Sequence, residues 1–284
     1  MTMDSTLDVY YEFVMGLTRE AAKVITNSIK LRKTVDTKRG DWDLVTQYDR
    51  EIEEIIIDRL KSQYPDHMFI AEESAGNNSP DLTDAPTWII DPIDGTTNFV
   101  HGFPHTCVVI ALAIRKEVVI GIVYNPLLEQ LFTARKGRGA FLNGEPISTS
   151  EVDDFSKALV CFEPGFIKIE SMAEYVVERL RAIIKVAHGI RTLGVAALTL
   201  CYVAMGAVDA YHIEGPGIEV WDIAAASLII AEAGGVVVDR VSGERVDIMK
   251  PRAIGAANSK IADAMVKIIR ETDERVDQMK NSTH

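Results

Sequence analysis

The sequence predicts an α/β protein, in the broad sense that includes α+β folds, whose architecture changes near the middle of the chain. Two amphipathic helical segments, followed by apolar runs joined by short turns, occupy the first half and indicate helices packed on an antiparallel sheet. Strand-like and helix-like segments alternate in the second half, which indicates a second, mixed sheet. We place the change near residues 148–154 and predict two regions, 1–150 and 151–284.

The bulk composition excludes several classes of protein. The 284 residues are 47% hydrophobic, which suffices for a large core, but no run of about 18 uncharged apolar residues indicates a membrane span. The formal net charge of −12 argues against a nucleic-acid partner. The first residues do not resemble a secretory signal, and the three cysteines lie far apart in apolar surroundings, so we expect a cytoplasmic protein with reduced cysteines.

The first half contains two predicted helices and several predicted strands. Apolar residues recur at helical spacing from Leu7 to Ile29 and again from Ile52 to Leu60. The spacing of Thr46 and Asp49 suits a capping box at the start of the second helix. Strands are expected at 68–71, 88–90, 107–114, 118–123, 131–134 and 140–142, with a hairpin between 107 and 123 and a tight turn at 143–144.

The second half alternates more regularly. We expect strands at 158–162, 189–192, 209–212, 236–238 and 253–256. Helices are expected at 171–186, 195–205, 221–233 and 259–279.

Acidic residues follow several of these predicted elements directly. The strand that ends in Ile90 runs into Asp91, and Pro92 is expected to end that strand and to form a turn that brings Asp94 beside Asp91. Glu72 follows the strand 68–71 in the same manner, and Asp222 opens the helix at 221–233. Buried acids are costly without a cationic partner, and an all-oxygen ligand set suits Mg²⁺ or Mn²⁺.

The residues around these acids could complete such a site. The turn would expose the carbonyl of Ile93, and Gly95 would allow close approach to a backbone whose N–H groups suit a phosphate. Each acid also has an ordinary explanation, because Asp222 suits the positive end of a helix and Asp49 suits a helix cap. The acids indicate a site only when they are taken together.

Three motifs resemble those of a known family. The run Asp91-Pro92-Ile93-Asp94-Gly95-Thr96-Thr97-Asn98 resembles the signature of the lithium-sensitive, Mg²⁺-dependent phosphomonoesterases. The run Trp221-Asp222-Ile223-Ala224-Ala225-Ala226 resembles the second signature, and Ala71-Glu72-Glu73-Ser74 resembles the glutamate motif. The pattern is most similar to the inositol monophosphatase family and covers nearly the whole chain. The resemblance implies a layered α-β-α-β-α sandwich.

The resemblance also implies roles for individual residues. One metal ion would be held by Glu72, Asp91 and the Ile93 carbonyl, and a second by Asp91, Asp94 and Asp222. Thr96, with Asp49 behind it, would orient the attacking water, Glu72 could act as a base, and Lys38 would lie near the mouth of the site. The implied substrate contacts are Glu72, Ile93, Asp94, Gly95, Thr96, Gly194, Val195, Ala196, Glu214 and Asp222.

The implied activity is Mg²⁺-dependent hydrolysis of myo-inositol monophosphates by direct attack of a metal-activated water. Mn²⁺ is the alternative cofactor, Li⁺ is the expected inhibitor, and a homodimer is the expected assembly. The chain departs from the family pattern at Val195, where a small hydroxyl residue is common, and at Phe166, where serine is common. The segment 212–219 is longer than usual, so Glu219 competes with Glu214 as the acid that contacts the inositol hydroxyls.

Other functions stay open at this point. A related phosphatase that acts on a sugar phosphate or on phosphoadenosine would have the same acids. A phosphatase with a nucleophilic aspartate would need an Asp-x-Asp-Gly-Thr motif, whereas this chain has one residue more between its acids. A metal-binding homologue without activity would lack a ligand or a water-positioning residue, and none of the expected residues is missing.

Overall fold

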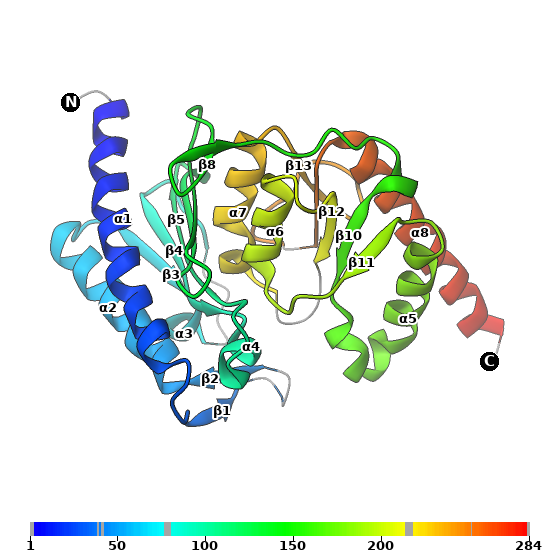
Figure 1. The fold of residues 1–284 in the computed structure, drawn as a ribbon, viewed down its shortest axis with the longest axis horizontal. Coiled ribbons are helices and arrows are strands. Elements are labelled where there is room, and N and C mark those ends of the chain that lie inside the picture. Colours follow the sequence, from blue (N-terminus) through cyan, green and yellow to red (C-terminus); the bar gives the residue numbers. More distant parts are fainter. Residues whose placement is uncertain are drawn as a thin grey trace.

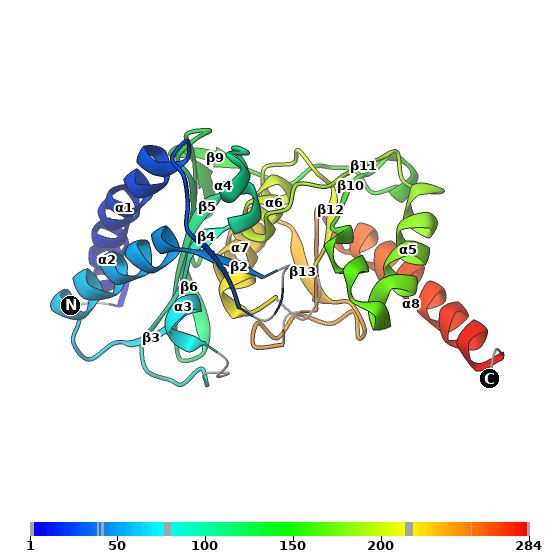
Figure 2. The ribbon, with the colours of Figure 1, turned by 90° about the horizontal axis from the view of Figure 1, so that it is seen from below.

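The protein is a stack of alternating helical and sheet layers in the computed structural model (Figure 1). The structure describes residues 3–38, 40, 43–76, 81–213, 218–250 and 252–282. The order of layers along the long axis is helix pair, seven-stranded sheet, helix pair, five-stranded sheet, helix pair. Figure 2 shows the same order from below, with α1 and α2 on the opposite side of the first sheet from α6 and α7. The layered α-β-α-β-α arrangement expected from the family resemblance is therefore confirmed.

The first helix pair is α1 (Met3–Ser28) and α2 (Gln47–Gln63), and both helices cover one face of the seven-stranded sheet. The two helices bury an apolar stripe against the strands. In this cluster, Ile25 of α1 and Ile56 of α2 lie with Trp88 of β4. The sheet has the order β3-β4-β5-β6-β7-β8-β9. Its strands are Met68–Ala71, Thr87–Asp94, Cys107–Ile114, Glu117–Asn125, Gln130–Arg135, Ala140–Leu142 and Glu145–Ile147.

The central layer is the apolar pair α6 (Ala196–Ala204) and α7 (Val220–Glu232), which lies between the two sheets. These helices pack closely on both sheets because each sheet has a glycine at the contact. A Cβ on Gly121 of β6 would lie 2.5 Å from the carbonyl oxygen of Ala225, and a Cβ on Gly255 would lie 2.5 Å from the Leu200 side chain. Such distances are shorter than any contact between real Cβ atoms, so larger residues would push the layers apart.

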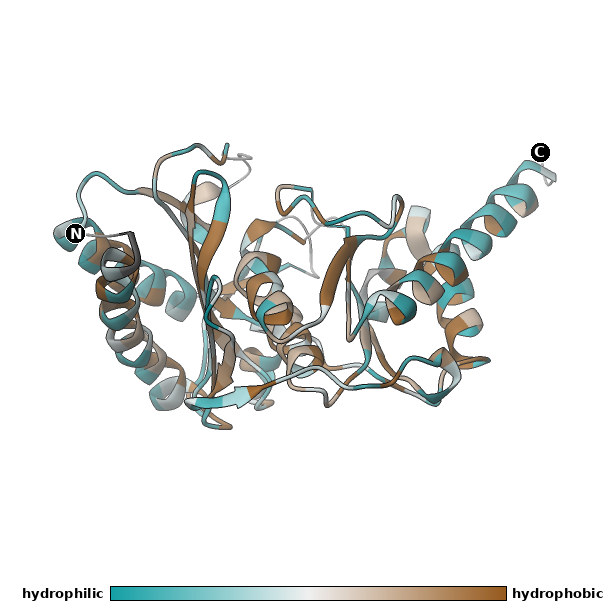
Figure 3. Ribbon diagram, turned by 90° about the horizontal axis from the view of Figure 1, so that it is seen from above, coloured by the Kyte–Doolittle hydropathy of each residue, from teal (hydrophilic) through white to brown (hydrophobic). Residues whose placement is uncertain are grey.

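The five-stranded sheet has the order β11-β10-β12-β14-β13 and is mixed. Its outer face is covered by α5 (Glu170–Ile184) and α8 (Ser259–Ser282). In Figure 3 these outer helices alternate between hydrophilic and hydrophobic colours, as expected for helices with one solvent-facing side. The strands, in chain order, are Leu159–Phe162, Gly189–Arg191, Ala210–Ile213, Val236–Asp239 and Ala253–Ala256.

Short elements complete the fold. A two-stranded ribbon of β1 (Val35–Thr37) and β2 (Leu44–Thr46) precedes α2, and the one-turn helix α3 (Glu72–Ala75) follows β3. The helix α4 (Thr96–His101) follows β4. The 3₁₀ turns η1 (Phe155–Lys157) and η2 (Pro164–Lys168) flank β10. Within the described residues, no helix combines the length and the apolar composition that a membrane crossing needs.

Most of the predicted elements are confirmed, but two details of the first sheet differ. The strand expected to end at Pro92 continues to Asp94, because a bulge between Asp91 and Asp94 takes up one extra residue and accommodates a proline that cannot donate to the ladder. In addition, β3 pairs with β4 in parallel, whereas the remaining neighbours in this sheet are antiparallel.

The division into regions 1–150 and 151–284 stays a prediction. The chain does pass from the larger sheet to the smaller one between β9 and β10, close to the expected boundary. However, α7 belongs to the second region and packs on strands of both sheets.

Candidate active site

The acids Glu72 and Asp91 are brought together by the parallel pairing of β3 and β4. Ala71 lies beside Ile90 in the register, so the next residue of each strand emerges at the same end of the sheet. The bulge that follows turns Asp94 toward the same side. Asp91 and Asp94 are buried, with 2% and 6% of their surface exposed.

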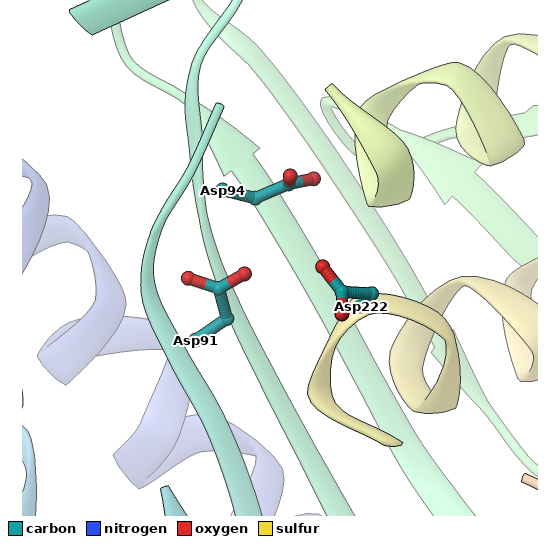
Figure 4. Close-up of side chains that lie close together, drawn as sticks. All are labelled: Asp91, Asp94 and Asp222. Atoms are coloured by element: carbon teal, nitrogen blue, oxygen red, sulfur yellow. The ribbon is translucent and has the colours of Figure 1, made fainter. Parts of the chain in front are cut away.

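Asp222 approaches the first sheet from the central layer, where it lies in the first turn of α7. Its carboxylate accepts a 2.6 Å hydrogen bond from the N–H of Glu219, and the Glu219 side chain caps the Asp222 N–H in return. Figure 4 shows Asp91, Asp94 and Asp222 pointing toward one another. One carboxylate oxygen from each of them lies within 4.8 Å of the other two. Helix capping alone therefore does not account for this convergence of carboxylates.

The electrostatics of these three aspartates fit a divalent cation. Burial and the charges of Glu72, Asp94 and Asp222 raise the pKa of Asp91 well above its ordinary value. Burial, followed by the charges of Asp94 and Glu72, also raises the pKa of Asp222. The Oδ1 atom of Asp91 is buried and has no hydrogen-bond partner among the described residues. An unpartnered carboxylate oxygen among like charges is the chemistry of a ligand for a hard cation.

Asp94 is held by the first turn of α6. Its Oδ1 and Oδ2 accept hydrogen bonds from the N–H groups of Ala196 and Ala197 at 3.1 and 2.6 Å, and the Cys107 thiol lies 3.7 Å from Oδ2. Burial raises the pKa of Asp94 to about 6, although the two N–H groups oppose that effect. The negative charge therefore lies at the positive end of a helix, which favours it.

Thr96 and Asp49 form the pair that the family resemblance implies. The Thr96 hydroxyl lies 3.2 Å from Asp49 Oδ1 and 3.0 Å from the Ile93 carbonyl oxygen, and can donate to either. Asp49 Oδ2 accepts from the N–H and the hydroxyl of Thr46, so the capping box predicted at the start of α2 is confirmed. Burial raises the pKa of Asp49 to about 6. Asp49 therefore both caps α2 and supports Thr96.

Lys38 lies beside Glu72, as expected for a lysine near this site. Its Nζ lies 2.8 Å from Glu72 Oε1 and 2.6 Å from Glu73 Oε1. Burial alone would lower the pKa of Lys38, but the two carboxylates together raise it. The lysine therefore stays charged and partly neutralises Glu72.

A cavity of about 510 Å³ lies beside these groups, and neither Asp49 nor Lys38 is among the described residues that line it. Gly95 lies in its wall with φ of 83°, where a Cβ would lie 2.9 Å from the His105 carbonyl oxygen, so only glycine fits. The predicted residues that line the cavity are Glu72, Asp91, Ile93, Asp94, Gly95, Thr96, Gly194, Val195, Ala196 and Asp222.

The loop at residues 193–195 contributes to the cavity wall and is held from both sides by residues that the sequence prediction missed. Glu163 Oε1 accepts from the N–H groups of Leu193 and Gly194 at 2.9 and 3.0 Å. Asn98 Nδ2 donates to the carbonyl oxygens of Leu193 and His105 at 2.8 and 2.7 Å. Glu163 directly follows β10, and an acid at the end of a predicted strand was an available signal. Asn98 falls inside the first motif but had no assigned role.

Two of the expected substrate contacts, Ala196 and Glu214, are not seen as free groups among the described residues. The N–H of Ala196 is already engaged by Asp94, so it is not free for a substrate. Glu214 lies outside the described residues, and its competitor Glu219 is occupied in capping α7. Glu219 is also absent from the described cavity lining.

The fold and this carboxylate-lined cavity define a class of layered α/β enzymes whose sites suit a hard cation. The model of the inositol monophosphatase family matches residues 6–274, and the chain belongs to that family.

Individual relatives agree with the family match. The chain is 41% identical to human inositol monophosphatase 1 over 261 residues, which cover 91% of this chain and 93% of that protein. Identity to inositol monophosphatase 2 of Solanum lycopersicum is 41% over 272 residues, covering 94% and 100%. The solved IMPase of Thermotoga maritima superposes with a TM-score of 0.84 at 34% identity, covering 94% of this chain and 99% of that one.

Proposed function

We propose that this protein hydrolyses myo-inositol monophosphates to inositol and inorganic phosphate. The observation that carries the proposal is the convergence of Asp91, Asp94 and Asp222 on one cavity beside the Thr96–Asp49 pair. Membership of the inositol monophosphatase family supports the same reaction, and the relatives named above carry the activity in their names.

We propose Mg²⁺ as the cofactor, with Mn²⁺ as the alternative. The carboxylates of Glu72, Asp91, Asp94 and Asp222, together with the Ile93 carbonyl, would hold it. A bound divalent cation lowers the pKa of water and neutralises charge on a phosphoryl group. The need for such a charge is clear, because buried carboxylates in a protein of net charge −12 would otherwise repel a phosphate ester.

Thr96 and Asp49 would orient the attacking water. When the Thr96 hydroxyl donates to Asp49 or to Ile93, its oxygen lone pairs remain available to accept a hydrogen bond from a water in the cavity. Glu72 would act as the base that takes the proton of that water. Lys38 would keep the Glu72 carboxylate in place for this step.

The phosphate would be received where α4 begins. The first N–H groups of a helix have no partner within it, so those of Gly95 and Thr96 can donate to phosphoryl oxygens. The water oxygen forms a new bond to phosphorus while the ester P–O bond breaks. The leaving alkoxide takes a proton from solvent on the Asp222 side, and no covalent phosphoenzyme forms.

The inositol ring would lie along Gly194, Val195 and Ala196 and beside Asp222. These residues line the side of the cavity formed by the loop before α6 and by α7. Glu214 is proposed as the acid that contacts the ring hydroxyls, although it lies outside the described residues.

The direct test is phosphate release from inositol 1-phosphate in the presence of Mg²⁺. Asp91→Asn should abolish most of that release, and an unchanged rate would contradict the cation assignment. A substrate panel with a galactose phosphate and phosphoadenosine distinguishes the proposed substrate from the related phosphatase activities. A trapped phosphoaspartate would contradict direct attack by water.

Three further proposals follow from the family resemblance and the composition. Li⁺ should inhibit the phosphatase in a manner that depends on the Mg²⁺ concentration. The protein should form a homodimer, which light scattering of the purified protein measures directly. A cytoplasmic location is proposed from the sequence and is tested by cell fractionation.

A further inference from the structure

We propose that Glu53 is a positioning residue that fixes Glu72, although Glu53 is not among the described residues that line the cavity. The proposal rests on the proposed function, because it takes Glu72 to be a cation ligand. Glu53 lies on α2, and only 3% of its surface is exposed.

The contacts of Glu53 are those of a helix cap supplied from a different helix. Its Oε2 accepts a 2.7 Å hydrogen bond from the N–H of Glu73, and its Oε1 accepts a 2.8 Å bond from the N–H of Ser74. The Ser74 hydroxyl also donates to Oε1. These N–H groups belong to the first turn of α3, whose N-cap residue, Ala71, offers no side-chain hydrogen bond.

The geometry makes this cap decisive for Glu72. Glu72 is the first residue of α3, so the orientation of its side chain depends on that single turn, which is too short to be stable alone. Lys38 forms ion pairs with the carboxylates of both Glu72 and Glu73. Glu53 therefore restrains the backbone of the turn while Lys38 restrains the side chains.

The position of Glu53 on α2 adds a second reason. Glu53 lies four residues after Asp49, so the two acids share one face of the helix and lie one turn apart. Asp49 contacts Thr96, whereas Glu53 contacts the turn that carries Glu72. One rigid helix thus sets the spacing between the water-orienting hydroxyl and the proposed base.

The test is the affinity for Mn²⁺, measured by electron paramagnetic resonance without substrate, in wild type and in Glu53→Gln. Both oxygens of Glu53 accept backbone hydrogen bonds, so an amide must turn its NH₂ group toward one N–H of α3. We expect the dissociation constant for Mn²⁺ to rise about 10- to 100-fold, as for other residues that orient metal ligands. Raising Mg²⁺ should restore much of the phosphatase rate.

Asp209→Asn is the matched control. Asp209 is also a buried acid, with 6% exposed, and its Oδ2 accepts a 2.7 Å bond from the N–H of Leu159 outside the cavity. This variant should lower the melting temperature and leave Mn²⁺ affinity unchanged. A folded Glu53→Gln protein that binds Mn²⁺ as tightly as wild type would overturn the proposal.

A rescue variant separates positioning from a general loss of stability. Ala71→Ser places a hydroxyl at the N-cap of α3, where it can accept from the same N–H groups. Adding it to Glu53→Ala should recover part of the Mn²⁺ affinity, and no recovery in a folded double variant would count against the proposal. If Glu53→Gln does not fold, Glu53→Asp takes its place. We expect Glu53→Asp to bind Mn²⁺ more weakly than wild type, and an unchanged Mn²⁺ affinity would contradict the positioning role of Glu53.

The outcomes also separate this inference from the proposed function. If the wild-type protein binds Mn²⁺ but releases no phosphate from inositol 1-phosphate, only the proposed function fails. If the wild-type protein binds no Mn²⁺, both fail.

Discussion

Asp94 Oδ2 accepts a 2.6 Å hydrogen bond from the backbone N–H of Ala197, which joins the end of β4 in the first sheet to the first turn of α6 in the central layer. The neighbouring Asp91 has no comparable contact, since its Oδ1 is buried without a hydrogen-bond partner among the described residues. Two aspartates three positions apart therefore differ in how the folded chain holds their carboxylates.

Asp94→Asn should lower the free energy of unfolding in cation-free buffer. Ala196 and Ala197 donate to different oxygens of Asp94, so an amide in the same position turns its NH₂ group toward one of the two N–H groups. A buried N–H left without an acceptor costs about 1–3 kcal/mol. Thermal unfolding measured with a chelator present checks this expectation. A melting temperature equal to that of wild type would show that the bond to α6 contributes nothing.

Asp91→Asn should instead raise the free energy of unfolding in cation-free buffer, and the size of this effect should depend on pH. The pKa of Asp91 is raised in the folded state, so the folded protein binds this proton more tightly than the unfolded chain does. The stability that this proton contributes is lost as pH rises above the ordinary value of 3.8. In cation-free buffer the melting temperature of Asp91→Asn minus that of wild type should therefore grow from pH 4 to pH 8. A difference that stays constant over this range would contradict the burial of charge at Asp91.

Thr96→Ala should lower kcat about 100-fold, because the attacking water loses the hydroxyl that positions it. Thr96→Ser keeps the hydroxyl near Asp49 and should retain most of the activity. Neither residue of the pair is a proposed cation ligand, so the rise in melting temperature on adding Mg²⁺ should be kept in both variants. Loss of that rise in Thr96→Ala would indicate that the substitution disturbs the cation site instead.

Glu163→Gln should leave KM for inositol 1-phosphate within about threefold of wild type, because a single oxygen of Glu163 accepts from both Leu193 and Gly194 and an amide keeps such an oxygen. Glu163→Ala should raise KM, because the loop then loses its acceptor. Steady-state kinetics of the two variants decides the matter. Equal KM values for the two variants would show that the loop does not depend on this carboxylate.

Gly121→Ala should destabilise the protein by about 1–3 kcal/mol, the usual cost of overpacking. The added methyl group would meet the carbonyl oxygen of Ala225 on α7. Gly16→Ala is the control, because nothing lies within 4 Å of a Cβ there and Gly16 lies inside α1. That change should stabilise the protein by about 0.5–1 kcal/mol in chemical denaturation. The reverse order of stabilities would contradict the close packing of β6 on α7.

The features that could be predicted from the sequence are those encoded locally. The helical periodicity from Ile52 to Leu60, the Thr46–Asp49 capping box and the turn at 143–144 depend on residues a few positions apart, and the structure confirms them. The grouping of Asp91, Asp94 and Asp222 was first suggested by their positions next to predicted strands and a predicted helix. The resemblance to a family then supported it, because their spacing alone does not place α7 beside β4.

The features that were missed depend on partners distant in the chain. A proline taken alone argues against the extension of β4 past Pro92. The extension is possible because of a bulge against β5, which the sequence of β4 does not reveal. Asn98 contacts a loop about a hundred residues later, and Glu53 contacts backbone N–H groups, which carry no sequence signal. Glu163 was visible as an acid at the end of a strand, but its role depends on the loop that it meets.

The central helix pair has a consequence for how the protein is made. Asp222 reaches the other acids only after α7 has packed between two sheets formed by separate halves of the chain. During synthesis, the first 150 residues present Glu72, Asp91 and Asp94 without the fourth carboxylate. A cation at the proposed site would therefore gain its full set of protein ligands only late in folding, and its binding would favour the completed protein over any partly folded intermediate.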